Sequence, residues 1–412
     1  MGFQSGLSGL NAATKHLDVI GNNVANSGVV GFKGSRALFA DVYANSAGGS
    51  SSSTVGIGAK VAAVSQEFAQ GNISSTNNPL DVAINGKGFY RMSESGTVTY
   101  SRNGQFHFDK DGYIINTDGL RLTGYGVDAT GTVIATAPVD LRLSSADIAP
   151  TPTSRFSIGV NLDSRLTVPA TPAFSQTDAT SYNRTTSGTV YDSLGNPHVM
   201  SFYFLKTATA GQWQVYGSID GTALANVNLG AGAGSPATLN FNTIGALSTA
   251  MPITAAVTVT NGAASPLSFS LDLTGSTHYG NEFSVNALSQ DGFTSGRLSG
   301  FNVSANGTVQ GRYSNGQAKN LGQIVLVDFA NPNGLQPLGQ NQWAESADSG
   351  LPVVGQPGSG TLGVLQASAV EDSNVDLTAE LVNMITAQRT YQANAQTIKP
   401  QDQVLQTLVN LR

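Results

Sequence analysis

The last forty residues of the chain decide its fold; from Ser373 to Arg412 they read SNVDLTAELVNMITAQRTYQANAQTIKPQDQVLQTLVNLR. Apolar side chains recur there at alternating spacings of four and three, which is the spacing of a coiled-coil face. The apolar members of this stripe are Leu377, Leu381, Met384, Tyr391, Ala395, Ile398, Leu405 and Val409. Ser373 followed by Asp376 fits the pattern of a capping box at a helix start. The stretch predicts a helix on the order of 55 Å long, which needs a partner surface along its length.

The polar side of this helix carries amides where a solvated helix usually carries Lys and Glu. Its amide residues are Gln388, Gln392, Asn394, Gln396, Gln401, Gln403 and Gln406. Amides can be buried at a lower desolvation cost than ions, so we expect both faces to become buried among neighbours in an assembled state. The alternative is a solvated, Gln-rich helix. Pro400 lies inside the pattern and predicts a kink, because proline removes one helical hydrogen bond.

The N-terminus supplies a second apolar stripe. Phe3, Leu10, Leu17 and Val24 recur every seven residues, and Leu7, Ala13 and Ile20 widen the stripe before an Asn-rich turn ends it near Gly28. Each stripe alone is typical of an ordinary core face, but two such stripes at opposite ends of one chain favour mutual pairing. The predicted assembly seam consists of Phe3, Leu7, Leu10, Leu17, Ile20, Val24, Leu377, Leu381, Met384, Tyr391, Ile398, Leu405 and Val409.

Between these two helices the sequence predicts β-structure. Asp111-Gly112 and Asp118-Gly119 are turn pairs that flank a short apolar run, and Leu267 begins a clean alternation typical of a half-buried strand. Gly86-Lys87-Gly88 follows an apolar run and predicts a hairpin turn rather than a phosphate-binding loop. A low-complexity stretch at 48–54 predicts a flexible linker.

The order of elements predicts nested domains, because paired end helices require the chain to go out and come back. We predict a mainly β fold with paired α-helical termini, in which the helices form a coiled-coil-like inner domain that carries two outer β-domains. The predicted domains are residues 1–27 with 373–412 (helices), 28–70 with 355–372 (connecting region), 71–145 with 286–354 (inner β-domain) and 146–285 (outer β-domain).

Composition excludes several classes of partner. Only 11% of the 412 residues are charged, against a usual value of about 25%. The net charge of −6 gives no electrostatic support for binding nucleic acid or an anionic membrane. With no cysteine, disulfides and thiolate metal sites are excluded. The sequence shows no signal-peptide pattern and no apolar run long enough for membrane insertion.

A search for an active site finds no persuasive candidate. His16, His107, His198 and His278 are scattered, without a metal-binding spacing. A faint calcium-loop pattern ending at Gly112 fails because its first position holds His107. We therefore predict no catalytic, cofactor-binding or metal-binding residues. A secreted enzyme or an adhesin built on the outer β-domain is the alternative of a different class.

Two end motifs and two internal segments carry a resemblance to a known family. Leu17–Asn26 with Gly31-Phe32-Lys33, and Ser373–Leu377 with Gln388–Gln396, are similar to the terminal motifs of bacterial flagellar rod and hook proteins. The segments around Tyr191-Asp192-Ser193-Leu194-Gly195-Asn196 and Ser201–Lys206 resemble the outer domain of hook proteins, which the shorter rod subunits lack. The resemblance therefore favours the hook over the distal rod, which remains the nearest alternative.

The resemblance implies a function, a location and partners. A hook subunit polymerises into a curved flexible tube that joins rod to filament and transmits motor torque. It lies outside the cell, in the flagellum, and leaves through the flagellar export apparatus without a cleaved signal peptide. The implied partners are further copies of the chain in a helical homopolymer, the distal rod, the hook cap and the hook–filament junction proteins.

Overall fold

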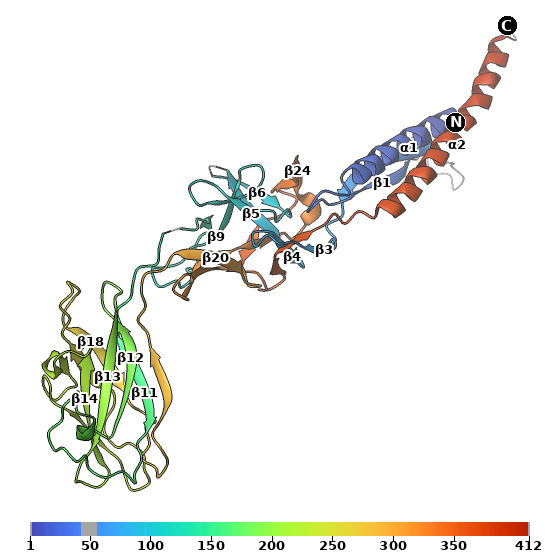
Figure 1. The fold of residues 1–412 in the computed structure, drawn as a ribbon. Coiled ribbons are helices and arrows are strands. Elements are labelled where there is room, and N and C mark those ends of the chain that lie inside the picture. Colours follow the sequence, from blue (N-terminus) through green and yellow to red (C-terminus); the bar gives the residue numbers. More distant parts are fainter. Residues whose placement is uncertain (1, 43–55, 95, 145, 411–412) are drawn as a thin grey trace. The chain divides into compact units, whose positions relative to one another are not determined.

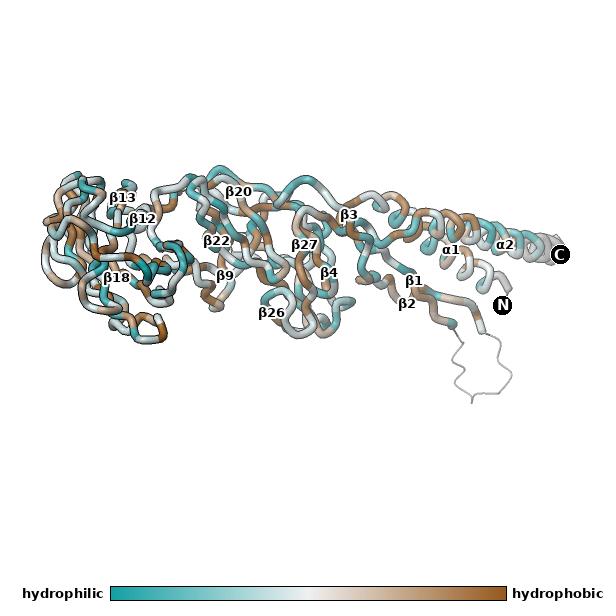
Figure 2. Tube along the Cα trace, turned by 60° about the horizontal axis from the view of Figure 1, so that its bottom comes forward, coloured by the Kyte–Doolittle hydropathy of each residue, from teal (hydrophilic) through white to brown (hydrophobic). Residues whose placement is uncertain are grey.

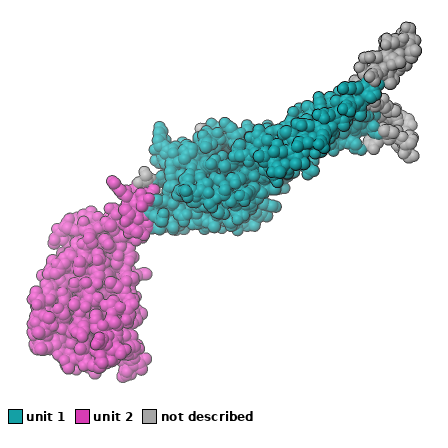
Figure 3. All heavy atoms as spheres, turned by 45° about the vertical axis from the view of Figure 1, so that its right-hand side comes forward, with its two compact units in different colours: residues 1–145, 300–312, 318–412 teal, residues 146–299, 313–317 magenta. Residues whose placement is uncertain are grey.

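The structure, a computed structural model, describes residues 2–42, 56–94, 96–144 and 146–410, with side chains for 4–42, 56–94, 96–144 and 146–400. The predicted linker at 48–54 lies outside the described residues. Contacts divide the chain into two compact units (Figure 3). Unit 1 comprises residues 1–145, 300–312 and 318–412, and unit 2 comprises residues 146–299 and 313–317. Unit 2 is thus inserted into unit 1.

Unit 1 contains both helices of the described chain. Helix α1 spans Gly2–Ala25 and helix α2 spans Leu377–Asn410, and the two lie side by side (Figure 1). Helix α2 continues through Pro400, so the proline does not end it. Short apolar and polar stretches alternate along both helices (Figure 2). Neither helix combines the length and apolarity needed to cross a membrane.

Two small antiparallel sheets and a ribbon connect these helices to the β-part of unit 1. The ribbon pairs β1 (Ser35–Val42) with β2 (Gly58–Gln66). The small sheets pair β3 (Ile73–Ser75) with β28 (Ala369–Glu371), and β4 (Val82–Asn85) with β27 (Val364–Ala367). Each of the two small sheets therefore joins a segment near the N-terminus to one near the C-terminus, whereas both strands of the ribbon lie near the N-terminus.

A thirteen-stranded sheet forms the β-part of unit 1. Its main path runs β20 (Leu298–Val303), β21 (Thr308–Tyr313), β22 (Ala318–Ile324), β9 (Arg121–Tyr125), β5 (Phe89–Glu94), β6 (Thr97–Ser101), β25 (Gln342–Ala344), β24 (Gln336–Gly339). Its side strands are β7 (His107–Phe108), β8 (Ile114–Ile115), β10 (Val139–Asp140), β23 (Leu326–Asp328) and β26 (Val353–Gly355). A 3-10 turn, η3, spans Pro332–Gly334.

The turn predictions for this sheet were right in one place and wrong in another. Gly112 and Gly119 adopt positive φ (85° and 83°), and β7 pairs with β8 across the first turn, as the Asp-Gly pairs predicted. The predicted hairpin at Gly86 is wrong. Strands β4 and β5 pair with different partners, and Lys87 bridges to Leu362, so this loop crosses between two sheets.

Unit 2 is a sandwich of two sheets. One sheet has the order β15 (Val227–Asn228), β17 (Ile253–Val257), β18 (Leu267–Asp272), β11 (Arg155–Asn161), β19 (Ser284–Gln290). The other has the order β12 (Arg184–Tyr191), β13 (Pro197–Lys206), β14 (Gln212–Ile219), β16 (Ala237–Asn240). Two 3-10 turns, η1 (Ala179–Ser181) and η2 (Leu224–Asn226), complete it. Apolar side chains from both sheets meet in one core, and β18 shows the predicted alternation.

The observed architecture confirms the predicted fold class, mainly β with paired helices at the two ends. The division into two units follows from contacts alone. The finer division into four domains stays a prediction.

Candidate assembly surface

The start of α2 is fixed by a side-chain cap. Asp376 Oδ1 accepts hydrogen bonds from the backbone N–H groups of Thr378 (2.9 Å) and Ala379 (3.1 Å). The predicted capping box beginning at Ser373 is therefore wrong, because Ser373 Oγ accepts from Val375 N–H instead, before the helix begins. Asp376 itself is the N-cap.

Two asparagines connect the beginning and the end of the chain where the helices meet the ribbon. Buried Asn23 donates from Nδ2 to Ser35 O (2.8 Å) and Glu380 Oε1 (3.1 Å), and its Oδ1 accepts from Ser35 N–H (2.8 Å). Asn374 Oδ1 accepts from Gly34 N–H (2.8 Å). Each amide satisfies backbone or side-chain groups of distant segments, so together they fix how α1, β1 and α2 meet.

A buried ion cluster lies beside these asparagines. Glu371 on β28 accepts from Lys33 Nζ at 2.6 Å and from Arg102 Nη1 at 3.0 Å, and the three side chains are 0–3% exposed. Lys33 also donates to Ala69 O (2.8 Å). Burial lowers the pKa of Lys33, an effect that the Glu371 charge opposes and the Arg102 charge reinforces. The cluster ties the segment after α1, the segment before α2 and the large sheet to one another.

The two helices run antiparallel and approach closely at glycines of α1. A Cβ atom on Gly9 would lie 2.8 Å from the side chain of Asn394, and one on Gly6 would lie 3.1 Å from Ile398. The opposite ends meet where Asn23 bonds Glu380. Glycine at these two positions therefore allows the close approach.

Helix α1 also packs against the β1–β2 ribbon. His16 contacts Phe39 edge-on with ring centroids 5.8 Å apart, and Ser8 Oγ accepts from Ala59 N–H (3.3 Å). Helix α1 thus packs against both α2 and the ribbon, whereas α1 is the element with which α2 makes its extensive contacts.

The predicted seam residues fall into three groups in the single chain. Ile20 is buried, and Leu10, Leu17, Val24, Met384 and Ile398 are half-buried. Leu7, Leu377, Leu381 and Tyr391 are 38–45% exposed. The side chains of Phe3, Leu405 and Val409 lie outside the described residues. The role of this set in assembly stays a prediction.

An uncovered apolar surface lies on the first half of α2, and sequence reasoning found only part of it. Its members are Leu377, Leu381, Val382 and Ile385, which are 44–58% exposed. Val382 and Ile385 were missed because the seam was read as a strict alternation of four and three. The spacing of four from Leu381 to Ile385 was the available signal. Hereafter these four residues are called the α2 patch.

A cavity of about 410 Å³ lies between α1, β1 and the start of α2. Ile20, Asn23, Val375 and Glu380 line it, and Glu380 Oε2 has no hydrogen-bond partner within the described chain. Across the described ranges, no cluster of three or more His, Asp or Glu is placed to hold a metal ion.

Family profiles match the chain from near its beginning to near its end. "Flagella basal body rod protein" matches residues 3–33, and "Flagellar hook protein FlgE/F/G D1 domain" matches residues 83–192. "Flagellar basal body protein FlaE D2 domain" matches residues 161–293, and "Flagellar basal body rod FlgEFG protein C-terminal" matches residues 366–411.

Full-length relatives and one solved structure agree with these profiles. The chain is 44% identical to the flagellar hook protein FlgE of Escherichia coli over 419 residues, which cover 100% of both chains. It is 44% identical to that of Salmonella typhimurium over 420 residues and 32% identical to that of Borreliella burgdorferi over 450 residues. The crystal structure of the Helicobacter pylori hook protein FlgE2 superposes with a TM-score of 0.51 at 14% identity. It covers 72% of this chain and 100% of that one, which supports the fold alone.

Proposed function

Because the chain belongs to the family of flagellar hook proteins, we propose that it polymerises into a curved, flexible tube that joins rod to filament and transmits motor torque. The hook family, and not the distal rod, is the one its full-length relatives represent. The α2 patch is the observation that carries the proposed mode of assembly, because four large apolar side chains on one helix gain free energy only when something covers them.

A second copy of the chain is the proposed cover for the α2 patch. In this proposal a different surface of the neighbouring subunit, and not its own patch, covers the patch. Contact between two different surfaces of identical subunits is heterologous, and repeated heterologous contacts that do not close a ring build an open helix. The weakly charged polar residues of α2 fit the same arrangement, because amides tolerate burial in a polymer wall better than ions do.

The two units would then have different tasks in the polymer. Packed helices of unit 1 would form the wall that carries torque. Unit 2 has its own buried hydrophobic core. It would contact unit 2 of neighbouring subunits through polar surfaces, and these contacts would change partners as the tube bends. The low fraction of charged residues, 11%, supports this part of the proposal, because sliding ionic contacts would have to break and desolvate repeatedly.

The proposed partners and location follow from the family. The chain would assemble with itself, contact the distal rod, the hook cap and the hook–filament junction proteins, and leave the cell through the flagellar export apparatus without a cleaved signal peptide. Profiles of basal body rod proteins match both of its ends, which supports contact with related axial proteins. We assign it no cofactor and no catalytic role.

Negative-stain electron microscopy of the purified chain after salt-induced polymerisation tests the proposal. Curved tubes are the expected result. Straight rods, closed rings or a persistent monomer under conditions that polymerise the Escherichia coli relative would contradict it.

A further inference from the structure

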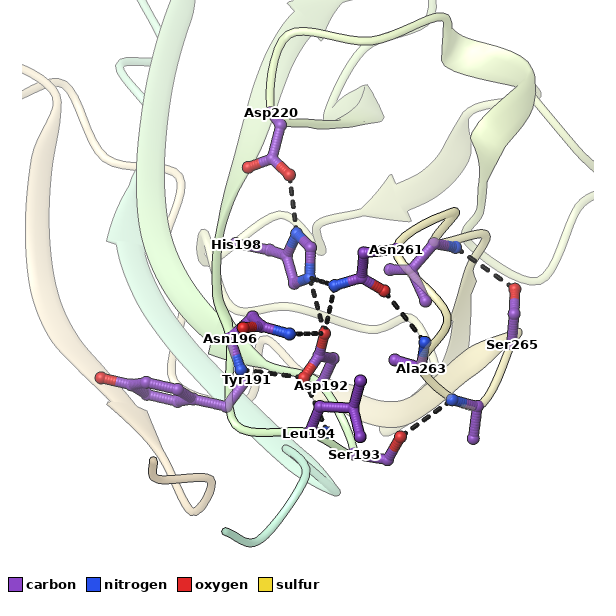
Figure 4. Close-up of polar contacts among 12 residues, drawn as sticks. Tyr191, Asp192, Ser193, Leu194, Asn196, His198, Asp220, Asn261, Ala263 and Ser265 are labelled. Atoms are coloured by element: carbon purple, nitrogen blue, oxygen red, sulfur yellow. Dashed lines mark hydrogen bonds and ion pairs between the residues drawn. The ribbon is translucent and has the colours of Figure 1, made fainter. Parts of the chain in front are cut away.

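A histidine in unit 2 lies between two carboxylates (Figure 4). His198, near the start of β13, places Nδ1 2.7 Å from Asp220 Oδ2 and Nε2 3.2 Å from Asp192 Oδ2. Its side chain is 12% exposed, and that of Asp192 is fully buried. A neutral imidazole carries one N–H and can donate to only one of these oxygens. Only the imidazolium form donates to both carboxylates, so the geometry favours a protonated ring.

Asp192 also holds the β12–β13 turn and a loop of the other sheet. Its Oδ1 accepts from the backbone N–H groups of Leu194 (2.8 Å) and Asn196 (2.9 Å). Its Oδ2 accepts from Asn196 Nδ2 (3.0 Å) and from Asn261 Nδ2 (2.5 Å), and Asn261 lies on the loop between β17 and β18. One carboxylate thus connects the two sheets of the sandwich.

A second contact seats the same loop on the same turn. Ser193 Oγ accepts from the backbone N–H of Ala264 (2.8 Å). The turn also touches the two segments by which the chain enters and leaves unit 2, because a Cβ on Gly195 would lie 2.7 Å from Pro150 and 3.2 Å from Thr294. The His198 cluster therefore lies at the end of the unit where the chain enters and leaves it.

We propose that His198 is a proton-operated latch of unit 2. In the protonated form it holds Asp192 and Asp220 together and keeps the loop at residues 261–265 seated on the β12–β13 turn. When the ring loses its proton, the lone pair of one ring nitrogen faces a carboxylate oxygen, and the two repel each other. The loop is then released. This inference concerns unit 2 by itself and does not depend on polymerisation.

The surroundings of the ring set the sign of the pH dependence. The groups that face it are Asp192 from the β12–β13 turn, Asp220 after β14 and the neutral Asn261, and no lysine or arginine bonds either aspartate within the described residues. Partial burial disfavours the charged ring, but hydrogen bonds and charges from Asp220 and Asp192 outweigh it and raise the pKa of His198. The latch is closed below the unfolded-state pKa of about 6.5 and opens as pH rises through the higher folded-state pKa.

His278, the other histidine of unit 2, provides an internal contrast. It packs against Trp213 and Phe241, and burial together with the charge of Lys206 lowers its pKa. Its contribution to stability therefore has the opposite sign, since it must gain a proton as the pH falls below its unfolded-state pKa. A pH effect from His278 would loosen the unit in acid, whereas the latch tightens it.

Two measurements on the full-length monomer test the latch. In NMR titrations of histidine-labelled protein, we expect the His198 resonance, assigned with His198→Gln, to titrate above about 6.5. Asp220→Asn, a substitution that the positive φ at this position (48°) accommodates, should move the pKa of His198 downward. A pKa of His198 at or below about 6.5, or one unchanged by Asp220→Asn, would overturn the proposal.

Hydrogen exchange reports the loop directly. After correction for intrinsic rates, amides at 261–265 should be better protected at pH 6 than at pH 8.5, by about tenfold for each unit by which the folded pKa exceeds the unfolded one. His198→Gln should remove this difference and His278→Gln should keep it. Equal protection at both pH values in the unsubstituted chain, or an unchanged difference in His198→Gln, would show that His198 does not operate the loop.

Discussion

Large apolar side chains are buried in the sandwich of unit 2 and exposed on helix α2. In unit 2, large side chains such as Phe202 and Trp213 are 0% exposed, and residues from both sheets cover one another. In α2, Ala387 is the buried apolar residue among the described side chains, while the larger residues of the α2 patch remain exposed. Unit 2 is therefore complete within one chain, whereas α2 is not. Substitutions in the two regions should separate folding from assembly.

The largest expected effect on assembly comes from Leu381→Asp. Leu381 is 44% exposed in the single chain. The substitution should therefore change the free energy of unfolding of the monomer by no more than about 0.5 kcal/mol. In the polymer, an unpaired carboxylate would be buried at each subunit contact, at a cost of several kcal/mol, so polymerisation should be lost. Sedimentation and electron microscopy after salt-induced polymerisation measure the outcome.

Thr390→Asn is the control for this experiment, because it introduces an amide without a charge, and the proposal allows amides to be buried in the polymer. Thr390 is exposed on the same helix and lies away from the α2 patch. It should polymerise far better than Leu381→Asp. Normal tubes from Leu381→Asp would show that the patch is not an assembly contact.

The next largest effect should come from Glu371→Gln. Removing the carboxylate leaves Lys33 and Arg102 buried without their partner, which destabilises unit 1 by about 3–5 kcal/mol. Assembly should weaken because the segments that carry α1 and α2 lose their common anchor. Urea unfolding followed by a probe in unit 1 measures the loss. Asp18→Asn, in the exposed Lys15–Asp18 pair, should leave stability unchanged. If unit 1 of Glu371→Gln were as stable to urea as that of the unsubstituted chain, the cluster would not stabilise unit 1.

Local sequence patterns predicted both helices and two of the turns, but they did not predict contacts between segments far apart in the chain. The stripes found α1 and α2, and Asp-Gly pairs found the turns at Gly112 and Gly119, because each signal depends on neighbouring residues. The Gly86 loop was misassigned because the partner of β4 is β27, far along the chain. For the same reason the sequence did not reveal the Glu371 cluster, because Arg102 and Lys33 lie 269 and 338 positions before Glu371.

The candidate surface shows the same limit at the level of single side chains. The sequence placed Leu377 and Leu381 on an apolar stripe, and they are exposed in the single chain. It could not show that Gly6 and Gly9 make room for α2, which decides the face of α2 that α1 covers. Periodicity identifies an apolar face, whereas the choice among its possible covers depends on packing.

Removing most of unit 2 should change the shape of the tube and leave assembly intact. Ile148 and Gly296 form an antiparallel bridge, so residues 149–295 can be replaced by an Asn-Gly turn that closes a hairpin there. Unit 1 keeps its helices and its own core, so tubes should still form, straighter or irregular because contacts between outer units are gone. Electron microscopy compares their curvature with that of the full chain. Unaltered curvature would show that unit 2 does not set the shape, and a folded variant without tubes would place essential contacts in unit 2.

The smallest effect on assembly should come from Leu271→Ala, although its effect on folding is large. Leu271 on β18 is 0% exposed in the core of unit 2, and truncating a buried leucine costs about 2–5 kcal/mol. The melting transition of unit 2 should fall while that of unit 1 stays, because Leu271 belongs to the core of unit 2 alone. Calorimetry of the monomer measures both transitions, and Ile244→Ala, at a 75% exposed position of the same unit, is the control that should change neither.

At temperatures below its lowered transition, Leu271→Ala should polymerise into tubes like those of the unsubstituted chain, since the α2 patch is untouched. Loss of tubes at a temperature where unit 2 is still folded would mean that the core of unit 2 and the assembly surface are coupled, and that the separation between the two regions fails.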